Sequence, residues 1–191
     1  DKAYTKQLLE GDIHTYNQKM AGLETRDQSK TFIYALIYGG GFAKIGEIAG
    51  GSPRKGKQLV DKFMRNLPAY ARLKEVVLTS MRKRGTLRGL DGRRLRVESE
   101  HSALNFLLQS AGAIVMKKAL VILKESLDDA GVWYKFVANV HDEWQIESSA
   151  DDAILVGQLG VKAIIKAGLH FEMNCPLDGD YNVGLTWADT H

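Results

Sequence analysis

The sequence has little of the residues that cross-link or bend a chain: one cysteine and three prolines among 191 residues. A single cysteine, Cys175, cannot form an internal disulfide, so a disulfide framework is excluded. No group of histidines or cysteines surrounds it in the sequence, and a zinc site is therefore not expected. We interpret Cys175 as a packed thiol.

Long hydrophobic segments are also missing. No uninterrupted apolar run approaches the roughly 18 residues that a transmembrane helix needs. The first residues, Asp1-Lys2-Ala3-Tyr4, do not resemble a signal peptide. We therefore expect a cytoplasmic protein without a membrane partner.

The composition is that of a globular chain of one or two domains, with 45% hydrophobic and 26% charged residues. The net charge is only +3, but basic residues are concentrated between positions 82 and 96, where the one acid is Asp91. The cations there are Arg82, Lys83, Arg84, Arg88, Arg93, Arg94 and Arg96. This density indicates contact with a polyanion such as a nucleic acid backbone, although a solvated charged surface is the alternative.

A regular series of basic and aromatic residues precedes a run of three glycines. Arg26, Lys30, Tyr34 and Tyr38 follow one another at steps of four, and Gly39-Gly40-Gly41 comes next. On an α-helix this spacing forms one stripe about 18 Å long, with cations at its N-terminal end and phenol rings below. Such a stripe can hold a molecule that carries phosphates and a base. The alternative is a solvated charged face with two tyrosines at its edge.

The ends of this helix are signalled in the sequence. Thr25 and Gln28 form a capping-box pattern, and Gly39 is a natural C-terminal stop. Phe32 and Leu36 lie on an apolar face, so the stripe is expected outside the buried side. The sequence thus predicts a helix from about residue 25 to residue 38 with an exposed stripe.

Hydrophobic periodicity and breaker residues divide the chain into a helical part, 1–85, and a mixed part, 86–191. The expected helices of the first part are 4–10, 13–23, 25–38, 43–49, one from Pro53 to before Pro68, and 69–83. In the last of these, Leu73, Val76, Val77 and Met81 are expected to face inward.

The second part combines β-rich arms with two helices. Asp91-Gly92 predicts a two-residue hairpin turn between arms 86–90 and 93–97. A helix over 100–128, β arms at 133–140 and 144–147, and a helix from residue 150 to 166 follow. The predicted fold class is α+β, with helices packed on an antiparallel sheet.

Three consecutive polar residues, His141-Asp142-Glu143, stand between the last two β arms. Adjacent acids are hard to bury but suit an open sheet edge, and Mg²⁺ prefers a few carboxylate oxygens together with water and phosphate. A metal site is one interpretation and an ordinary charged turn is the other.

The segment 51–58 contains glycines and lysines and nearly matches a phosphate-binding P-loop. Gln58 stands where that motif needs Ser or Thr for magnesium, and no buried strand precedes Gly51. We therefore reject this interpretation.

The motifs taken together resemble a known family. Arg26-x3-Lys30-x3-Tyr34-x3-Tyr38-Gly39, Asp91-Gly92-Arg93-Arg94, Asn105-x3-Gln109 and His141-Asp142-Glu143 stand in the order found in the C-terminal half of a family A DNA polymerase. The phage replicative branch looks most similar. The resemblance extends over essentially the whole chain, and the ordered set is far more specific than any one motif. It implies a cytoplasmic location in a bacterial cell or a phage-infected host.

This resemblance implies a fingers subdomain at 1–85 and part of the palm at 86–191. Arg26 and Lys30, together with His14, would bind the triphosphate of the incoming deoxynucleotide and offset its growing charge, which gives the two cations a catalytic role. Tyr34 would line the sugar pocket, where tyrosine goes with acceptance of dideoxynucleotides. Tyr38 would lie beside the templating base.

The resemblance also implies contacts with primer-template DNA. The implied DNA-binding residues are Gly39, Arg93, Arg94, His101, Asn105, Gln109 and His141. Relatives often have arginine at the position of His101. His141, between the last two β arms, would also shape the turn.

Asp142 would be a ligand of two Mg²⁺ ions, with Glu143 assisting, in template-directed nucleotidyl transfer. The family takes its other essential aspartate from an Asp-Tyr-Ser-x-x-Glu type motif, which is absent from this sequence. The thumb and an exonuclease domain are absent as well. We therefore expect a C-terminal portion of a DNA-directed DNA polymerase that needs the remainder of the polymerase chain and is inactive alone.

Two alternatives stay open from the sequence. One is a non-catalytic nucleic-acid-binding module that keeps the basic hairpin and the fingers. The other is one half of a split polymerase, in which a separate chain supplies the missing aspartate.

Overall fold

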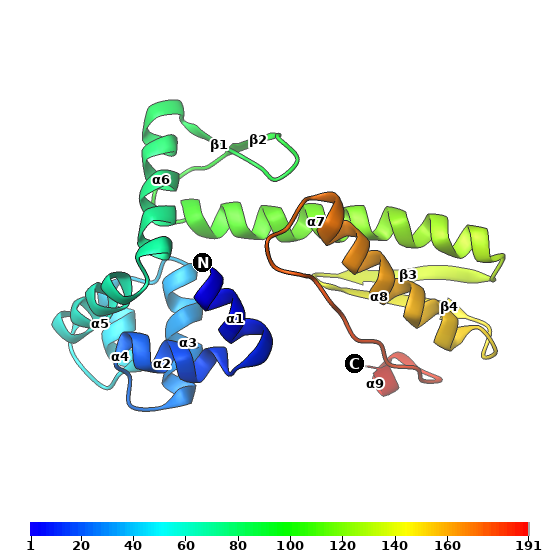
Figure 1. The fold of residues 1–191 in the computed structure, drawn as a ribbon, viewed down its shortest axis with the longest axis horizontal. Helices are drawn as coiled ribbons and strands as arrows, with labels where there is room; N and C mark the ends of the chain where they lie inside the picture. The colour runs from blue at the N-terminus through cyan, green and yellow to red at the C-terminus, as the bar shows by residue number, and fades with distance from the viewer. Residues whose placement is uncertain (191) are drawn as a thin grey trace. The chain divides into compact units, whose positions relative to one another are not determined.

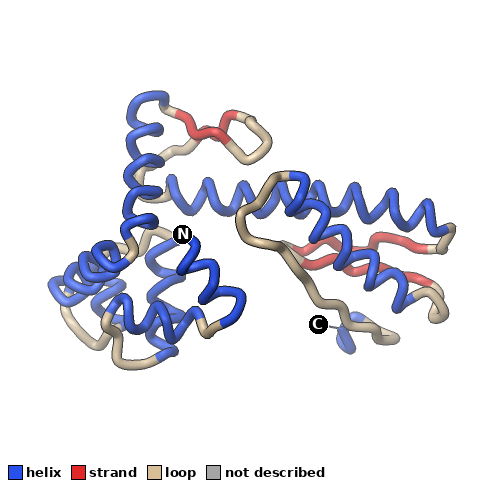
Figure 2. The backbone as a smooth tube through the Cα atoms, in the orientation of Figure 1, coloured by secondary structure: helices blue, strands red, loops and turns tan. Residues whose placement is uncertain are grey.

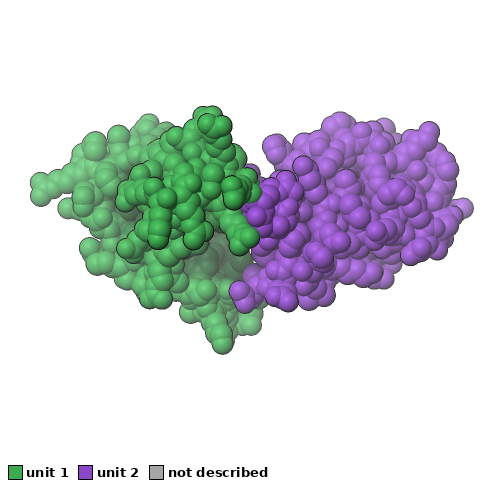
Figure 3. Space-filling model, turned by 90° about the horizontal axis from the view of Figure 1, so that it is seen from above, with its two compact units in different colours: residues 1–88, 94–108 green, residues 89–93, 109–191 purple. Residues whose placement is uncertain are grey.

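The computed structural model describes residues 1–190, which form two compact units (Figures 1 and 3). Unit 1 consists of residues 1–88 and 94–108, and unit 2 consists of residues 89–93 and the chain from Gln109 onward. Helices dominate both units, and each two-stranded sheet is antiparallel (Figure 2). The predicted α+β class is confirmed. The assignment of 1–85 to fingers and 86–191 to palm stays a prediction.

Unit 1 begins with six helices and a small hairpin. Their bounds are α1 Lys2–Glu10, α2 Ile13–Ala21, α3 Arg26–Ile37, α4 Phe42–Ile48, α5 Pro53–Asn66, α6 Pro68–Arg84, β1 Thr86–Arg88 and β2 Arg94–Arg96. The helices that the sequence predicts are therefore present, with ends within a few residues of those expected.

Local signals explain where these helices begin. The Thr25 hydroxyl accepts a hydrogen bond from the Gln28 backbone N–H at 3.1 Å, and the Gln28 side chain accepts one from the Thr25 N–H at 3.2 Å. The capping box at the start of α3 is thus complete. At α5, Ser52 is the N-cap and Pro53 the first helical residue, where a missing N–H costs nothing.

The main core of unit 1 lies between α3, α4 and α5. The rings of Phe32 and Phe63 meet edge to face with centroids 5.4 Å apart, and both side chains are fully buried together with Ile45. Helices α4 and α5 approach closely at Gly46 and Gly56, both buried. Edge-to-face rings and close helix contact fix α3 to the α4–α5 pair.

Helix α6 packs through a narrower face than expected. Val77 is buried and Met81 is half-buried, as predicted, but Leu73 is 41% and Val76 58% exposed. The prediction that these two residues face inward is wrong. The small hairpin covers only the side of α6 that carries Val77, which packs in one cluster with Leu87 of that hairpin.

The hairpin itself has a different register from the predicted one. Leu87 pairs with Leu95, and the Gly89 N–H donates to the Arg93 carbonyl at 2.8 Å, so the loop has three residues, Leu90–Gly92, and not two. Within it the Gly92 N–H donates to the Gly89 carbonyl at 2.9 Å. This register buries Leu87 and Leu95 and leaves Arg88, Arg94 and Arg96 exposed.

Unit 2 contains a second, longer hairpin and two long helices. The remaining elements are α7 Ala103–Ala130, whose first residues belong to unit 1, β3 Tyr134–Val140, β4 Glu143–Ser148, α8 Ala153–His170 and α9 Trp187–Thr190. Leu123 and Leu127 of α7 share a cluster with Ala163 of α8, and Trp144 of β4 packs against it. The two helices are thus fixed to the same hairpin.

Two helices have the length and composition of membrane spans. Ala103–Ala130 and Ala153–His170 both meet this criterion by their average hydropathy. Neither is an uninterrupted apolar run, because Lys117 and Lys118 interrupt α7 and Lys162 and Lys166 interrupt α8. Core helices meet the same criterion, and both helices contribute buried residues to the clusters of unit 2.

Candidate functional site

The four residues of the α3 stripe lie on the solvent side of the helix. Arg26, Lys30, Tyr34 and Tyr38 are all exposed, whereas Phe32 and Leu36 are buried. (Tyr38 is the C-cap of α3.) The Lys30 ammonium has no hydrogen-bond or ion-pair partner among residues 1–190. The expected exposed stripe is therefore present, with its cations at the N-terminal end.

The two tyrosines form the lower part of the stripe. Their rings stack with centroids 6.5 Å apart and an interplanar angle of 24°, and Tyr34 and Tyr38 are 50% and 53% exposed. Each ring therefore presents apolar surface to solvent, on which a planar base or a sugar can pack.

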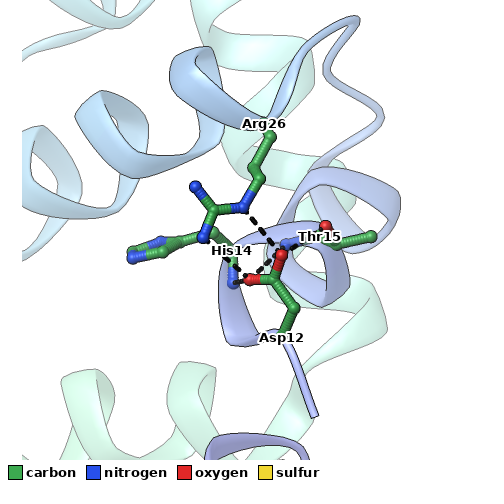
Figure 4. A network of polar contacts seen from close by, with 4 residues as sticks. All are labelled: Asp12, His14, Thr15 and Arg26. Atoms are coloured by element: carbon green, nitrogen blue, oxygen red, sulfur yellow. Dashed lines mark hydrogen bonds and ion pairs between the residues drawn. The ribbon is translucent and has the colours of Figure 1, made fainter.

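The first residue of the stripe is held by a carboxylate from another helix. The Arg26 guanidinium donates to Asp12 through Nε at 2.7 Å and through Nη2 at 3.3 Å (Figure 4). These hydrogen bonds, followed by that from the Thr15 hydroxyl, hold the pKa of the Asp12 carboxyl well below its usual range. The pair lies in solvent, with side chains 52% and 44% exposed.

His14 and Arg26 both donate hydrogen bonds to the Asp12 carboxylate, His14 through its backbone N–H. Asp12 is the N-cap of α2, and its Oδ1 accepts from the His14 backbone N–H at 3.0 Å. The imidazole is half-buried, and its Nδ1 is buried without a hydrogen-bond partner among the described residues. The structure thus brings together two of the three residues predicted to bind phosphate, His14 and Arg26.

The end of α3 contacts the segment before α7. Gly39 has a φ of 81°, and a Cβ added to it would lie 2.5 Å from the His101 carbonyl oxygen. One turn further on, Asn105 is half-buried, and its Oδ1 is buried without a hydrogen-bond partner in the described part of the chain. The predicted DNA-binding residues Gly39 and His101 are therefore adjacent, and Asn105 follows them on α7.

The other predicted DNA-binding residues differ in their surroundings. The Arg93 side chain donates from Nε to Asp91 Oδ2 at 2.7 Å, which ties it to its own turn and lowers the pKa of the Asp91 carboxyl. The neighbouring Arg94 is exposed on β2. Gln109 is exposed on α7. Arg94 is the more accessible of the two arginines to a phosphate.

The acidic triplet forms the tip of the β3–β4 hairpin. Val140 pairs with Glu143, so His141 and Asp142 are the two turn residues, and His141 has a φ of 54°. Asp142 is exposed, and Glu143 accepts a hydrogen bond from the Gln145 side chain. The strands extend as predicted, with a bulge between Phe136 and Ala138.

A single exposed carboxylate does not make a metal centre. Within residues 1–190 no group of three or more His, Cys, Asp or Glu side chains is placed to hold a metal ion. Mg²⁺ needs near-octahedral oxygen ligation, of which Asp142 could supply one oxygen. The residues present therefore fit a magnesium site only as one part of a larger ligand set.

The predicted site residues are divided between the two units. His14, Arg26, Lys30, Tyr34, Tyr38, Gly39, Arg94, His101 and Asn105 belong to unit 1, and Arg93, Gln109, His141, Asp142 and Glu143 belong to unit 2. Sequence reasoning did not identify Asp12, which also belongs to unit 1 and binds Arg26. Its signal was an aspartate directly before the apolar start of a helix, which marks an N-cap but does not show that Arg26 lies beside it.

The charges are distributed unequally between the units. Unit 1 holds 19 of the 26 Lys and Arg residues but only 10 of the 23 Asp and Glu residues, leaving 7 and 13 for unit 2. The small net charge of the chain thus conceals a strongly basic unit and an acidic one. A basic unit attracts polyanions, and the exposed stripe of α3 belongs to it.

Several named DNA polymerases match almost the whole length of this chain. The sequence is 40% identical to the DNA-directed DNA polymerase of Escherichia phage Phieco32 and 39% identical to that of Escherichia phage T7, each over 98% of this chain. It is 26% identical to DNA polymerase I of Aquifex aeolicus over 86% of the chain. The match covers 32%, 30% and 30% of these relatives, so the chain spans about a third of their length.

The fold matches a solved polymerase structure. The POL domain of Pol1 from M. smegmatis, solved in complex with DNA primer-template and dNTP, superposes with a TM-score of 0.78. The match covers 87% of this chain and 33% of that chain at 21% identity, which shows a common fold. Residues 3–189 match the family model of DNA polymerase family A. The chain therefore belongs to DNA polymerase family A.

Proposed function

We propose that this chain is the nucleotide-binding and primer-template-binding part of a DNA-directed DNA polymerase. The observation that carries the proposal is the exposed α3 stripe, which presents two cations and two stacked phenol rings on one face of the basic unit. Two comparisons support the proposal. The matching phage proteins are DNA-directed DNA polymerases, and the M. smegmatis domain was solved with primer-template and dNTP.

In this proposal each part of the stripe has a separate task. Arg26 and Lys30 bind the triphosphate of the incoming nucleotide, and fixed cations stabilise the charge that develops on the phosphates during transfer. Tyr34 and Tyr38 pack against the sugar and the base. His14, the second residue of α2, adds a third contact to the phosphates.

The remaining proposed roles concern the DNA and the metal. Arg93, Arg94, His101, Asn105 and Gln109 contact the primer-template, with phosphate contacts fixing its position. When bound, Mg²⁺ would activate the attacking hydroxyl and stabilise the leaving oxygen, and family A polymerases use such ions. Asp142 and Glu143 are the residues of this chain that would hold it, together with ligands from the rest of the polymerase.

Lys30→Ala tests the nucleotide site in a polymerase chain that includes this segment. Loss of a charged contact to phosphate costs about 1.5–3 kcal/mol, so kcat/KM for the deoxynucleotide should fall roughly 10- to 150-fold. Primer extension at varied deoxynucleotide concentration measures this. Lys19→Ala, which removes an exposed lysine at the end of α2, is the matched control and should leave kcat/KM unchanged. Unchanged kinetics in Lys30→Ala would contradict the proposed function.

A further inference from the structure

The carboxylate of Asp12 joins two helices that carry proposed phosphate-binding residues. It accepts five hydrogen bonds, from the His14 N–H at 3.0 Å, the Thr15 N–H at 3.4 Å, the Thr15 hydroxyl at 2.8 Å, and Arg26 Nε and Nη2 at 2.7 and 3.3 Å (Figure 4). Three of these come from the first turn of α2, so the carboxylate is anchored there and is not free to follow the arginine.

This anchoring fixes the Arg26 side chain. Two donors of the planar guanidinium meet one carboxylate, which sets both its position and the orientation of its plane. Among the described residues, no hydrogen bond uses Arg26 Nη1. An arginine side chain carries about 2 kcal/mol of rotamer entropy, and Asp12 removes much of this freedom before any ligand arrives.

Helix capping alone does not account for the arrangement. A capping aspartate needs only to accept hydrogen bonds from N–H groups of its own helix. Asp12 already does so from the backbone N–H groups of His14 and Thr15. Arg26 comes from α3, and both side chains of the ion pair are about half exposed, so the pair adds little to the stability of the fold. What the pair does provide is a defined guanidinium beside His14 at the start of the α3 stripe.

We propose that Asp12 is a positioning residue that holds Arg26 in place for the triphosphate of a nucleotide. The proposal rests on the proposed function, because it assigns the ligand of Arg26. Asp12 does not touch the nucleotide and acts through Arg26. The opposite role, in which Asp12 competes with the triphosphate for Arg26, predicts the opposite change in affinity.

Asp12→Asn separates positioning from capping, because asparagine caps a helix as well as aspartate but lacks the charge that binds the guanidinium. The dissociation constant of dTTP with Mg²⁺, measured on this chain by calorimetry, should rise about fivefold. In an Arg26→Ala background the same change should have no further effect. Asp61→Asn, which breaks the exposed Lys57–Asp61 pair of α5, is the matched control and should leave the constant unchanged.

A second measurement does not need the nucleotide. The Arg26 Nε–H resonance should exchange slowly with water in the original chain and rapidly in Asp12→Asn, whereas capping alone would leave it unchanged. Binding that is unaltered or tighter in Asp12→Asn overturns the positioning role, and so does rapid exchange in the original chain. Failure of the original chain to bind dTTP, with slow Nε–H exchange, would instead contradict the proposed function.

Discussion

At the C-terminal end of α3, one glycine decides how closely the helix approaches the segment before α7. Gly39 has a φ of 81°, and the His101 carbonyl occupies the space that a Cβ would need. A left-handed backbone alone costs a non-glycine residue about 1–2 kcal/mol. The glycine therefore allows the exposed tyrosines and His101 to lie on the same part of unit 1.

Gly39→Ala should lower the free energy of unfolding by about 2 kcal/mol or more, because backbone strain and overlap with a carbonyl add. Urea unfolding followed by circular dichroism measures this. The control is Gly112→Ala in α7, where an added Cβ meets nothing within 4 Å. That change should raise the free energy of unfolding by about 0.5–1 kcal/mol, since alanine is the better helix former. Equal effects of the two changes would refute the packing argument.

At the scale of elements, the pair α4–α5 depends on backbone contact between two helices. A Cβ on Gly56 would overlap the Phe42 carbonyl oxygen and lie 2.6 Å from the Gly46 nitrogen. Both obstacles are backbone atoms, which cannot rotate away as a side chain can. The helices approach so closely only because neither has a side chain at the contact, and Ile45 and Phe63 are buried beside it.

Gly56→Ala should therefore destabilise unit 1 by about 1–3 kcal/mol, although alanine is the better residue for an isolated helix. All three tryptophans, Trp133, Trp144 and Trp187, lie in unit 2. The urea transition seen by circular dichroism should thus shift to lower urea, while the tryptophan fluorescence transition stays in place. The control is Gly160→Ala in α8, where an added Cβ meets nothing within 4 Å. This change should not shift the circular dichroism transition to lower urea.

Most elements were predictable from local signals, and the errors have a common cause. The capping box of α3 and the prolines at α5 and α6 mark helix ends through atoms a few residues apart. The buried face of α6 depends instead on what packs against it, and the hairpin covers Val77 but not Val76. The loop at Asp91-Gly92 has three residues and not the predicted two, because the strand register that buries Leu87 and Leu95 requires the longer loop.

At the scale of the whole molecule, the division of charge favours binding of a polyanion by unit 1. That unit has nine more basic than acidic residues, and unit 2 has six more acidic than basic ones. Neutralising DNA phosphates releases counterions, which makes affinity fall steeply with salt. Exposed cations such as Arg94 on β2 should each contribute to this dependence.

Primer-template duplex binding by this chain should weaken linearly in a plot of log affinity against log salt. Arg94→Gln should reduce the slope by about one if Arg94 contacts a phosphate. Fluorescence anisotropy of labelled duplex at several salt concentrations measures this. Lys166→Gln, which removes an exposed cation of the acidic unit, is the control and should leave the slope unchanged. A slope that Arg94→Gln does not alter would remove Arg94 from the DNA contacts.

The exposed stripe of α3 was predictable in its residues but not in its contacts. The step of four on one helix places Arg26, Lys30, Tyr34 and Tyr38 on one exposed stripe whatever surrounds the helix. That Asp12 holds Arg26 could not be read from the sequence, because the two residues belong to different helices.

The sequence by itself determined the helices, their caps, the exposed stripe and the family, because each depends on residues close together or on an ordered set of motifs. Only the tertiary structure decided the partner of Arg26, the close contact of Gly39 with His101, the buried side of α6 and the register of the small hairpin. These depend on which segments meet in space. Packing between distant residues, and not local propensity, selects among the arrangements that each segment could adopt alone.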